Sequence, residues 1–344
     1  MPQKLDVSDF LAAAGPILDV RAPVEYVHGQ IPGALSFPLF TDEERAEIGT
    51  LYHKQGQQAA VLRALEIWGP KMAEMVRAAR KLAPEGQVRV HCWRGGQRSG
   101  AVAWLLEQAG FDVGLLVGGY KAYRREVLAS FARPWRLVLI GGLTGSGKTE
   151  LLQALSELGE QTIDLEALAG HRGSAFGGLG LPPQPSPEQF ENNLHTQLAG
   201  LEPRRPLWLE DESTNIGQIV LPLALREQMQ QAPVLALDLP RELRLQRLIG
   251  IYAPHPPEAL AACVEKIRKR MGGARTQACL AALAEGQPEV MIERVLDYYD
   301  KGYRHSLSDR ATETLTLSQD DPPGAARQLL ELYQRVEAPM ADGL

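Results

Sequence analysis

The sequence is short of the residues that build disulfide frameworks and structural metal sites. Its 344 residues contain three cysteines, Cys92, Cys263 and Cys279. An odd, widely spaced set does not form the paired framework of a small secreted domain, and no two of these cysteines have zinc-finger spacing. A low number of cysteines is consistent with a reducing compartment. In such a compartment a cysteine in an unusual sequence setting more often has a reactive role than a structural one.

Long hydrophobic runs are absent as well. No stretch approaches the length of a membrane span, and the first residues lack the charged-then-apolar order of a signal peptide. Hydrophobic residues make up 44% of the chain and charged residues 23%, which is typical of globular proteins. We therefore expect a cytoplasmic protein of two domains, and a monomer is compatible with this composition.

The chain has no overall excess of positive charge. Its net charge is −6, with residues 1–133 contributing +2 and residues 134–344 contributing −8. The segment 241–275 differs, because it holds eight basic residues against three acidic ones. Screening limits the reach of distant charges, so a local basic face can bind phosphates on an acidic protein. A solvated helix face explains the same pattern.

Apolar runs alternate with helical patterns along the chain, which predicts an α/β fold with parallel sheets. The first three runs predict strands at 17–20, 88–90 and 113–117, and a helix that ends at Gly110. The pattern restarts after Pro134, with strands expected at 137–140, 207–209 and 234–237. We expect one domain over residues 1–133 and a second over 134–344, with a long loop at 173–187 and an acidic C-terminal tail.

The segment from His91 to Ser99 (HCWRGGQRS) lies between a predicted strand and a predicted helix. A loop that curls over a helix N-terminus points several N–H groups at one place, which binds anions and lowers the pKa of a cysteine there. Cys92 is therefore the expected reactive thiol, and Arg98 is expected to grip a phosphate-like group. Ser99 belongs to the same expected anion loop and could cap the helix. The rest of the anion loop comprises Trp93, Arg94, Gly95, Gly96 and Gln97. Cys263 and Cys279 lie in Ala/Leu-rich stretches and are expected to be packing residues.

The Cys-x5-Arg spacing is shared by rhodanese-like enzymes, which carry sulfur or selenium on the thiol, and by cysteine phosphatases. Two further segments favour the first chemistry. Residues 17–38 (ILDVRAPVEYVHGQIPGALSFP) and 117–123 (VGGYKAY) resemble the opening and closing motifs of rhodanese-like domains. That resemblance implies a rhodanese-like domain with a central parallel sheet, in which Asp19 and Arg21 are structural.

The second domain opens with a P-loop. Residues Gly142 to Thr149 (GLTGSGKT) match G-x4-G-K-[ST] after a predicted strand and before a predicted helix, which is the structural setting of this motif. Backbone N–H groups of such a loop cradle a diphosphate or triphosphate, the lysine neutralises it, and the threonine can hold an optional Mg²⁺. The expected phosphate-binding residues are Gly142, Thr144, Gly145, Ser146, Gly147, Lys148 and Thr149.

A P-loop domain needs an acidic residue at the end of a neighbouring strand. Glu210 and Asp211 follow the predicted strand 207–209. Asp164 follows a shorter apolar segment, where it could contact a substrate or cap the next helix. Residues 239–247 (LPRELRLQR) resemble the arginine-bearing turn of small nucleotide kinases, although these arginines could also pair with carboxylates.

A rhodanese-like domain followed by a P-loop domain, together with HCWRGGQRS, DLE at 164–166, HRGSAFG at 171–177 and EDES at 210–213, resembles the tRNA 2-selenouridine synthase family over nearly the whole chain. The pair Thr214-Asn215 departs from the resemblance. The family implies action on wobble 2-thiouridine in the anticodon stem-loop of tRNA. It implies S-alkylation with geranyl diphosphate, then replacement of the thioether by selenium from selenophosphate. On this basis the expected tRNA contacts are Lys266, Arg268, Lys269, Arg270 and Arg275.

Three other functions agree with parts of the pattern. A tRNA sulfurtransferase would use the same thiol without selenium. A cysteine phosphatase fused to a small-molecule kinase would hydrolyse phosphate esters at Cys92. A non-enzymatic, ATP-gated module for tRNA binding or sulfur sensing, with Cys92 as a redox reporter, would leave the nucleoside unchanged.

Overall fold

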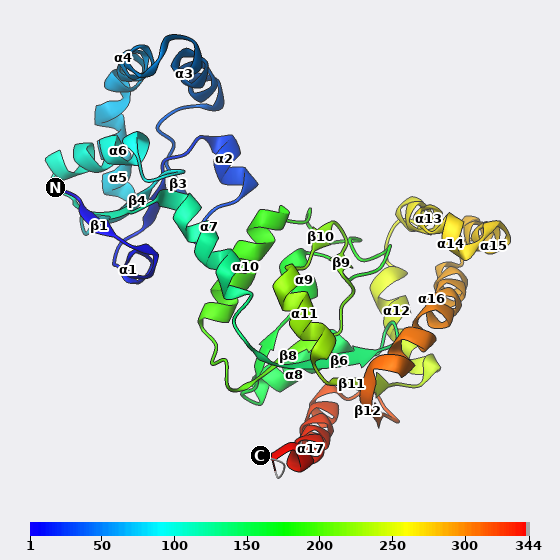
Figure 1. Cartoon of the computed structure of the whole chain (residues 1–344). Coiled ribbons are helices and arrows are strands. Elements are labelled where there is room, and N and C mark those ends of the chain that lie inside the picture. The colour runs from blue at the N-terminus through cyan, green and yellow to red at the C-terminus, as the bar shows by residue number, and fades with distance from the viewer. Residues whose placement is uncertain (342–344) are drawn as a thin grey trace. The chain divides into compact units, whose positions relative to one another are not determined.

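The computed structural model describes residues 1–341, and the chain divides into two compact units (Figure 1). The first unit contains residues 1–131 and, in addition, residues 188–196. The second contains the remainder of the chain. Residues 188–196 belong to helix α10 (Pro187–Ala199), so the chain returns to the first unit after the P-loop. The sequence analysis predicted two contiguous domains and did not predict this returning segment.

The first unit is built on a five-stranded sheet in the order β1-β5-β4-β2-β3, and every neighbouring pair is parallel. Its inner strands carry apolar side chains that are buried on both faces, as parallel sheets require. The strands are β1 (Gln3–Leu5), β2 (Ile17–Asp19), β3 (Leu35–Ser36), β4 (Gln87–His91) and β5 (Asp112–Leu116).

Seven α-helices and a short 3-10 turn accompany this sheet. Helices α5 and α6 bury their apolar faces in a core with the sheet, which includes Leu18, Val90 and Cys92. The helices are α1 (Val7–Ala12), α2 (Pro23–His28), α3 (Asp42–Gln55), α4 (Gln57–Trp68), α5 (Met72–Leu82), α6 (Gln97–Gln108) and α7 (Gly119–Ser130), with the 3-10 turn at Gly69–Lys71.

The second unit has its own five-stranded parallel sheet, in the order β12-β11-β6-β8-β7. The central strand β6 is followed at once by the P-loop. The strands are β6 (Arg136–Gly142), β7 (Gln161–Ile163), β8 (Pro206–Glu210), β11 (Val234–Asp238) and β12 (Ala311–Thr316). A small antiparallel hairpin joins β9 (Asn215–Ile216) and β10 (Ile219–Val220).

Two apolar clusters stabilise the second unit. One lies between the sheet and helices α8 and α17, and the other is formed mainly by helices α12 to α16. The helices are α8 (Lys148–Glu157), α9 (Leu165–Ala169), α11 (Leu223–Gln231), α12 (Arg241–Tyr252), α13 (Pro257–Lys266), α14 (Arg268–Met271), α15 (Gly273–Ala284), α16 (Pro288–Arg310) and α17 (Pro322–Ala341).

The structure confirms the predicted α/β class, with a parallel sheet in each unit. Each strand predicted from an apolar run is present within a few residues of its expected limits, and residues 173–186 contain no helix or strand, as the Gly- and Pro-rich composition predicted. Among the described residues, no helix combines the length and apolar character that crossing a membrane requires.

Candidate active site

The loop that carries Cys92 joins strand β4 to helix α6 and is closed by two glycines. Gly95 has a φ of 65°, and a Cβ atom there would lie 2.6 Å from the carbonyl oxygen of Leu116. A Cβ atom on Gly119 would lie 2.4 Å from the carbonyl oxygen of Cys92. The backbone of β5, α7 and the loop can approach this closely only because both side chains are absent.

The thiol of Cys92 lies inside this loop, where only 3% of the residue is exposed. Its Sγ atom accepts a hydrogen bond from the Ser99 hydroxyl over 3.1 Å. Burial alone would raise the pKa of the thiol, but the Ser99 hydroxyl, the backbone N–H groups of Ser99 and Arg94, and the charge of Arg98 together lower it. The loop therefore favours the thiolate, which is the nucleophilic form.

Ser99 has a different role from the one predicted. The residue before helix α6 is Gly96, and no side chain caps the helix. Ser99 is the third residue of the helix, too late to cap it, and its hydroxyl faces Cys92 Sγ and the Gly96 carbonyl oxygen. The prediction that Ser99 caps the helix is wrong, because the serine side chain turns back toward the thiol instead of toward the free N–H groups of the first turn.

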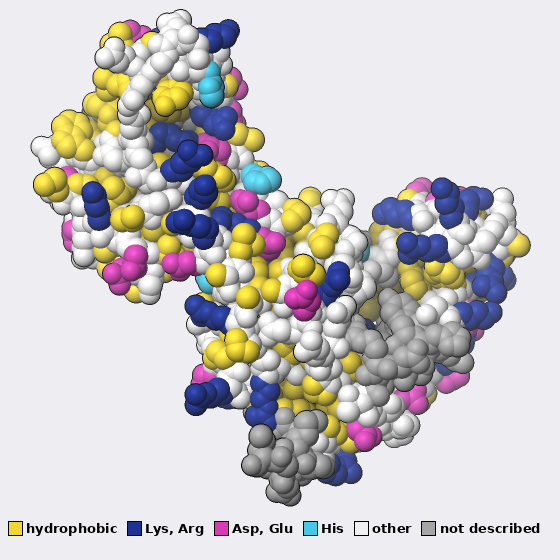
Figure 2. Space-filling model, in the orientation of Figure 1, with side chains coloured by type: hydrophobic (Ala, Val, Ile, Leu, Met, Phe, Trp, Pro, Cys, Tyr) yellow, Lys and Arg dark blue, Asp and Glu magenta, His cyan; other side chains and the backbone are white. Residues whose placement is uncertain are grey.

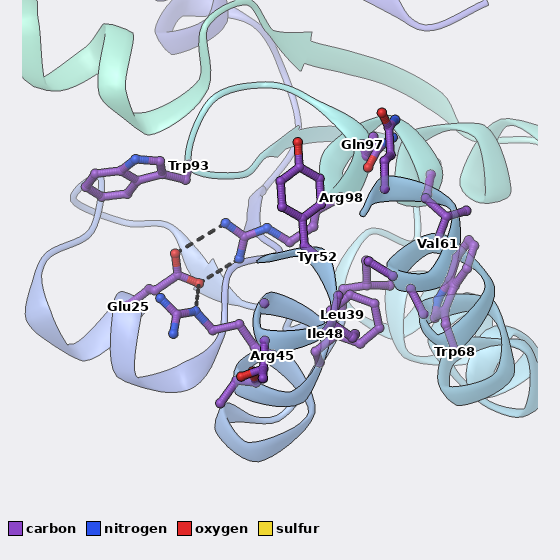
Figure 3. A pocket seen from close by; sticks show the side chains of 18 of the residues that line it. Glu25, Leu39, Arg45, Ile48, Tyr52, Val61, Trp68, Trp93, Gln97 and Arg98 are labelled. Carbon is purple, nitrogen blue, oxygen red and sulfur yellow. Dashed lines mark hydrogen bonds and ion pairs between the residues drawn. The ribbon is translucent and has the colours of Figure 1, made fainter. Parts of the chain in front are cut away.

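Arg98 is held by a carboxylate that sequence reasoning did not include in the site. Its two terminal nitrogens donate to the Glu25 oxygens over 2.6 and 3.2 Å, and the Nε atom of Arg45 lies 3.4 Å from the same carboxylate (Figure 3). Burial would raise the pKa of Glu25, but hydrogen bonding to Arg98 and the charges of both arginines lower it. The guanidinium fork that we expected to grip an anion is thus engaged by Glu25, while its charge still acts on Cys92. Glu25 follows the Asp19–Arg21 motif by four residues, which is the signal that could have identified it.

The remaining loop residues differ in exposure. Trp93 is half-buried, with its ring 5.7 Å from that of Tyr120. Arg94, Gly96 and Gln97 are exposed, so they present polar groups at the loop surface.

Asp19 and Arg21 are structural, as the rhodanese resemblance implied. Both are completely buried, and Arg21 donates from Nε and Nη2 to the Asp19 carboxylate and from Nη2 to the Gly29 carbonyl oxygen. The guanidinium carbon lies 3.9 Å from the centre of the Tyr120 ring. This buried pair links the end of strand β2 to Tyr120 of helix α7.

In the second unit, all seven predicted phosphate-binding residues line a single cavity of about 530 Å³. Strand β6 ends at Gly142 and helix α8 begins at Lys148, so the loop has the strand–loop–helix setting that the motif requires. Gly147, with a φ of 85°, precedes the helix, and a Cβ atom there would lie 2.9 Å from the guanidinium of Arg247.

Three glutamates face the P-loop lysine and threonine. The Thr149 hydroxyl donates to Glu210 over 2.7 Å, while the second carboxylate oxygen of Glu210 is buried without a hydrogen-bond partner among the described residues. Glu166, Glu210 and Glu212 each place a carboxylate oxygen within 4.8 Å of the others. Burial, followed by repulsion within the cluster, raises the pKa of Glu166 to about 9, and burial raises that of Glu210 to about 7 despite the charge of Lys148.

This arrangement fits a divalent cation. Mg²⁺ beside a bound phosphate is coordinated by oxygen atoms, such as those of carboxylates and of a threonine hydroxyl. The buried Glu210 oxygen without a hydrogen-bond partner is available as one such ligand. Sequence reasoning identified Glu210 and placed Asp211 here, and both Asp211 and Asp164 line the cavity. It missed Glu166 and Glu212, although each lies two residues after a named acidic residue, Asp164 and Glu210 respectively.

Asp164 caps helix α9. Its Oδ1 atom accepts a hydrogen bond from the Ala167 N–H over 2.7 Å, which is the helix-cap alternative. Burial raises the pKa of its carboxyl group.

All three arginines of residues 239–247 form ion pairs with carboxylates, and one of them also lines the P-loop cavity. Arg244 is buried and forms a two-pronged ion pair with Asp300, at 2.9 and 2.7 Å. Arg241 pairs with Glu293 and Asp297. Arg247 lines the P-loop cavity and pairs with Glu150 and Asp320. Of the three arginines in this segment, Arg247 is the one that lines the P-loop cavity.

The five basic residues proposed as tRNA contacts are all exposed on the segment from the end of α13 to α15, where Lys and Arg side chains gather (Figure 2). Arg268 forms an ion pair with Glu265, in which the guanidinium donates two hydrogen bonds to the carboxylate. Cys263 and Cys279 are buried in the apolar cluster of the same helices, and burial raises the pKa of both thiols, so both are packing residues as predicted.

Comparison with known proteins gives matches across both units. A family model described as the tRNA 2-selenouridine synthase AAA domain matches residues 135–323, and one described as the rhodanese-like domain matches residues 5–126. The chain is 38% identical to the tRNA 2-selenouridine synthase of Cronobacter sakazakii, over 91% of this chain and 92% of that protein. It is 35% identical to that of Bdellovibrio bacteriovorus, over 87% and 91% of the two chains. It is 37% identical to that of Hahella chejuensis, over 89% and 90%.

Proposed function

Because this chain belongs to the tRNA 2-selenouridine synthase family, we propose that it is a tRNA-modifying enzyme that converts wobble 2-thiouridine to 2-selenouridine through an S-geranylated intermediate. Its substrates are tRNA, geranyl diphosphate and selenophosphate. The observation that carries the proposal is the buried Cys92 thiol, which accepts a hydrogen bond from Ser99 in a glycine-closed loop, on the same chain as a P-loop.

The first step uses the second unit. Lys148, Thr149 and the loop N–H groups hold the diphosphate of geranyl diphosphate, and Glu166, Glu210 and Glu212 can hold a Mg²⁺ ion against it. Mg²⁺ would supply charge neutralisation for the leaving group. The sulfur of 2-thiouridine forms a bond to C1 of the geranyl group, the C1–O bond breaks, diphosphate leaves, and the nucleobase loses its N3 proton.

The second step uses the first unit. The Cys92 loop holds selenophosphate, an anion with the shape of phosphate, and Cys92 positions its selenium. Selenium forms a bond to C2 of the nucleobase, the C2–S bond breaks, and geranylthiol leaves with a proton. Water attacks the phosphorus, the P–Se bond breaks and phosphate leaves, while protons go to the sulfur of geranylthiol and to N3 of the nucleobase. Selenium enters and leaves this step at the selenide level, so no oxidant is needed.

Binding of tRNA is assigned to the exposed basic residues from Lys266 to Arg275. Their side chains would contact backbone phosphates, which makes the interaction sensitive to salt.

The proposal is tested by incubating the protein with an anticodon stem-loop that carries 2-thiouridine, adding geranyl diphosphate first and selenophosphate second. Nucleoside mass spectrometry should find S-geranyl-2-thiouridine after the first addition and 2-selenouridine after the second. An unchanged nucleoside after both additions would reject the proposal.

A further inference from the structure

The first unit contains a large apolar cavity that the steps above do not use. It has a volume of about 1230 Å³ and lies between helices α3 and α4 and the start of α6. Its apolar lining includes Leu39, Phe40, Ile48, Val61, Leu65 and Trp68. Ligand pockets commonly measure roughly 300–1,000 Å³, so this space is large enough for a small molecule and part of a nucleotide.

The helices that line the cavity leave apolar side chains uncovered. Helix α3 has no fully buried residue, and Tyr52 near its end is 54% exposed. On α4, Val61 is 36% and Leu65 50% exposed, although both line the cavity. Exposed apolar side chains that share one concave surface indicate a binding site more often than scattered ones do.

The cavity is continuous with the Cys92 loop. Trp93 of that loop, together with Gln97 and Arg98 at the start of helix α6, is part of its lining, and Cys92 itself belongs to the same apolar cluster as Phe40 and Trp68. Figure 3 shows the charged group of Glu25, Arg45 and Arg98 on one side, with Val61 and Trp68 on the other and Leu39 and Ile48 between them. A ligand that fills this space therefore has a charged or polar end near the loop and a hydrocarbon end between the helices.

The P-loop cavity offers a different chemistry. It is smaller, at about 530 Å³, and its lining includes Lys148, Glu166 and Arg247. Charged side chains of both signs suit phosphate and a cation, whereas a hydrocarbon chain would have to displace their water.

We propose that the cavity beside Cys92 holds the hydrocarbon chain of an S-alkylated 2-thiouridine in tRNA, which is the ten-carbon geranyl chain if the proposed function holds. Each buried CH₂ group adds to the affinity, so the chain anchors the modified base at the thiol and an unalkylated base is held less tightly. The inference rests on the proposed function and assigns to this cavity the recognition of its intermediate.

Adjacent residues on α4 provide a matched pair of variants. Val61 lines the cavity, whereas Leu62 is 62% exposed and is not part of the lining. Val61→Asp places a charge in the cavity, Val61→Trp fills it without a charge, and Leu62→Asp places the same charge outside it. Thermal unfolding of each variant checks that the first unit stays folded.

The experiment measures the dissociation constants of two anticodon stem-loops, one with S-geranyl-2-thiouridine and one with 2-thiouridine, at a fixed salt concentration. Wild type should bind the geranylated RNA more tightly. Val61→Asp and Val61→Trp should each weaken binding of the geranylated RNA on the order of tenfold and leave the other RNA unchanged, since several apolar groups lose their burial. Leu62→Asp should bind both as wild type does.

Equal preference for the geranylated RNA in wild type and both folded Val61 variants would overturn the assignment, as would a wild type that binds the two RNAs equally. Either failure can be told apart from failure of the proposed function, because the latter is a wild type that produces no 2-selenouridine in the nucleoside assay.

Discussion

The hydroxyl of Ser99 donates a hydrogen bond to the Sγ atom of Cys92 over 3.1 Å. Cys92 directly follows strand β4 and Ser99 is the third residue of helix α6, so the bond spans the glycine turn between them. It is one of several interactions that favour the thiolate of Cys92 against the opposing effect of burial.

Replacing Ser99 with alanine should raise the pKa of Cys92, because a hydrogen bond to the charged form lowers the pKa and its removal reverses that effect. The thiolate of Cys92 can be followed by its ultraviolet absorbance as pH rises, with a Cys92→Ala protein as the blank. Cys263 and Cys279 should titrate at higher pH, since burial raises the pKa of both. An unaltered titration of Cys92 in Ser99→Ala would mean that the hydroxyl has no influence on the thiol.

Lys148→Ala should reduce geranyl transfer on the order of 100-fold or more, because the lysine is expected to neutralise the diphosphate that leaves. The same variant should still convert a pre-geranylated stem-loop to 2-selenouridine, since that step is assigned to Cys92. Separate assays of the two steps make the distinction. Intact geranyl transfer in Lys148→Ala would remove the P-loop from the first step.

The acidic cluster should make stability depend on pH. Glutamate in an unfolded chain has a pKa near 4.5, whereas burial raises that of Glu166 to about 9 and that of Glu210 to about 7. Between these values the folded protein binds more protons than the unfolded chain, so stability should fall as pH rises from about 5 to 9. Melting temperatures at several pH values should show this decline in wild type and a weaker one in Glu166→Gln.

One control and one further measurement accompany the pH profile. Glu157→Gln removes an exposed carboxylate of helix α8 outside the cluster and should leave the pH dependence unchanged. Mg²⁺ should stabilise wild type more at high pH than at low pH, because it competes with protons for the same oxygens. A pH profile that is identical in wild type and Glu166→Gln would contradict the raised pKa values.

Neutralising Lys266, Arg268 and Arg270 together should weaken tRNA binding and flatten its salt dependence. Each lost phosphate contact reduces the slope of log K against log salt by roughly 0.7 to 0.9. A triple variant of Arg77, Lys81 and Arg204, which are exposed elsewhere, removes the same charge and serves as the control. If both triple variants changed the slope equally, net charge rather than this surface would account for binding.

Much of the fold could be predicted because local patterns determine it. Leu137 to Ile140 is a short apolar run before a glycine-rich turn, and it forms the central strand that ends at the P-loop. The Cys92 loop was equally readable, since strand, glycines and helix follow each other directly in the sequence.

Contacts between segments that are distant in the sequence could not be predicted from it. Glu25 contacts Arg98 across 73 residues of sequence, and Glu166 lies beside Glu210 and Glu212 across more than 40. Separations of this size give no sequence pattern from which the contacts could be predicted. Helix α10 hydrogen-bonds to the first unit through Glu188 and Asn192, although its sequence neighbours belong to the second. The sequence analysis predicted no element at residues 42–68, and the apolar residues of α3 and α4 are recognisable as a site only from their arrangement around the cavity.

The most direct test of the central claim is nucleoside mass spectrometry of a 2-thiouridine stem-loop incubated with geranyl diphosphate and selenophosphate, comparing wild type with Cys92→Ala and with Cys279→Ala as the control. The account predicts 2-selenouridine from wild type and Cys279→Ala, and accumulation of S-geranyl-2-thiouridine in Cys92→Ala. Formation of 2-selenouridine by Cys92→Ala at the wild-type rate would contradict it.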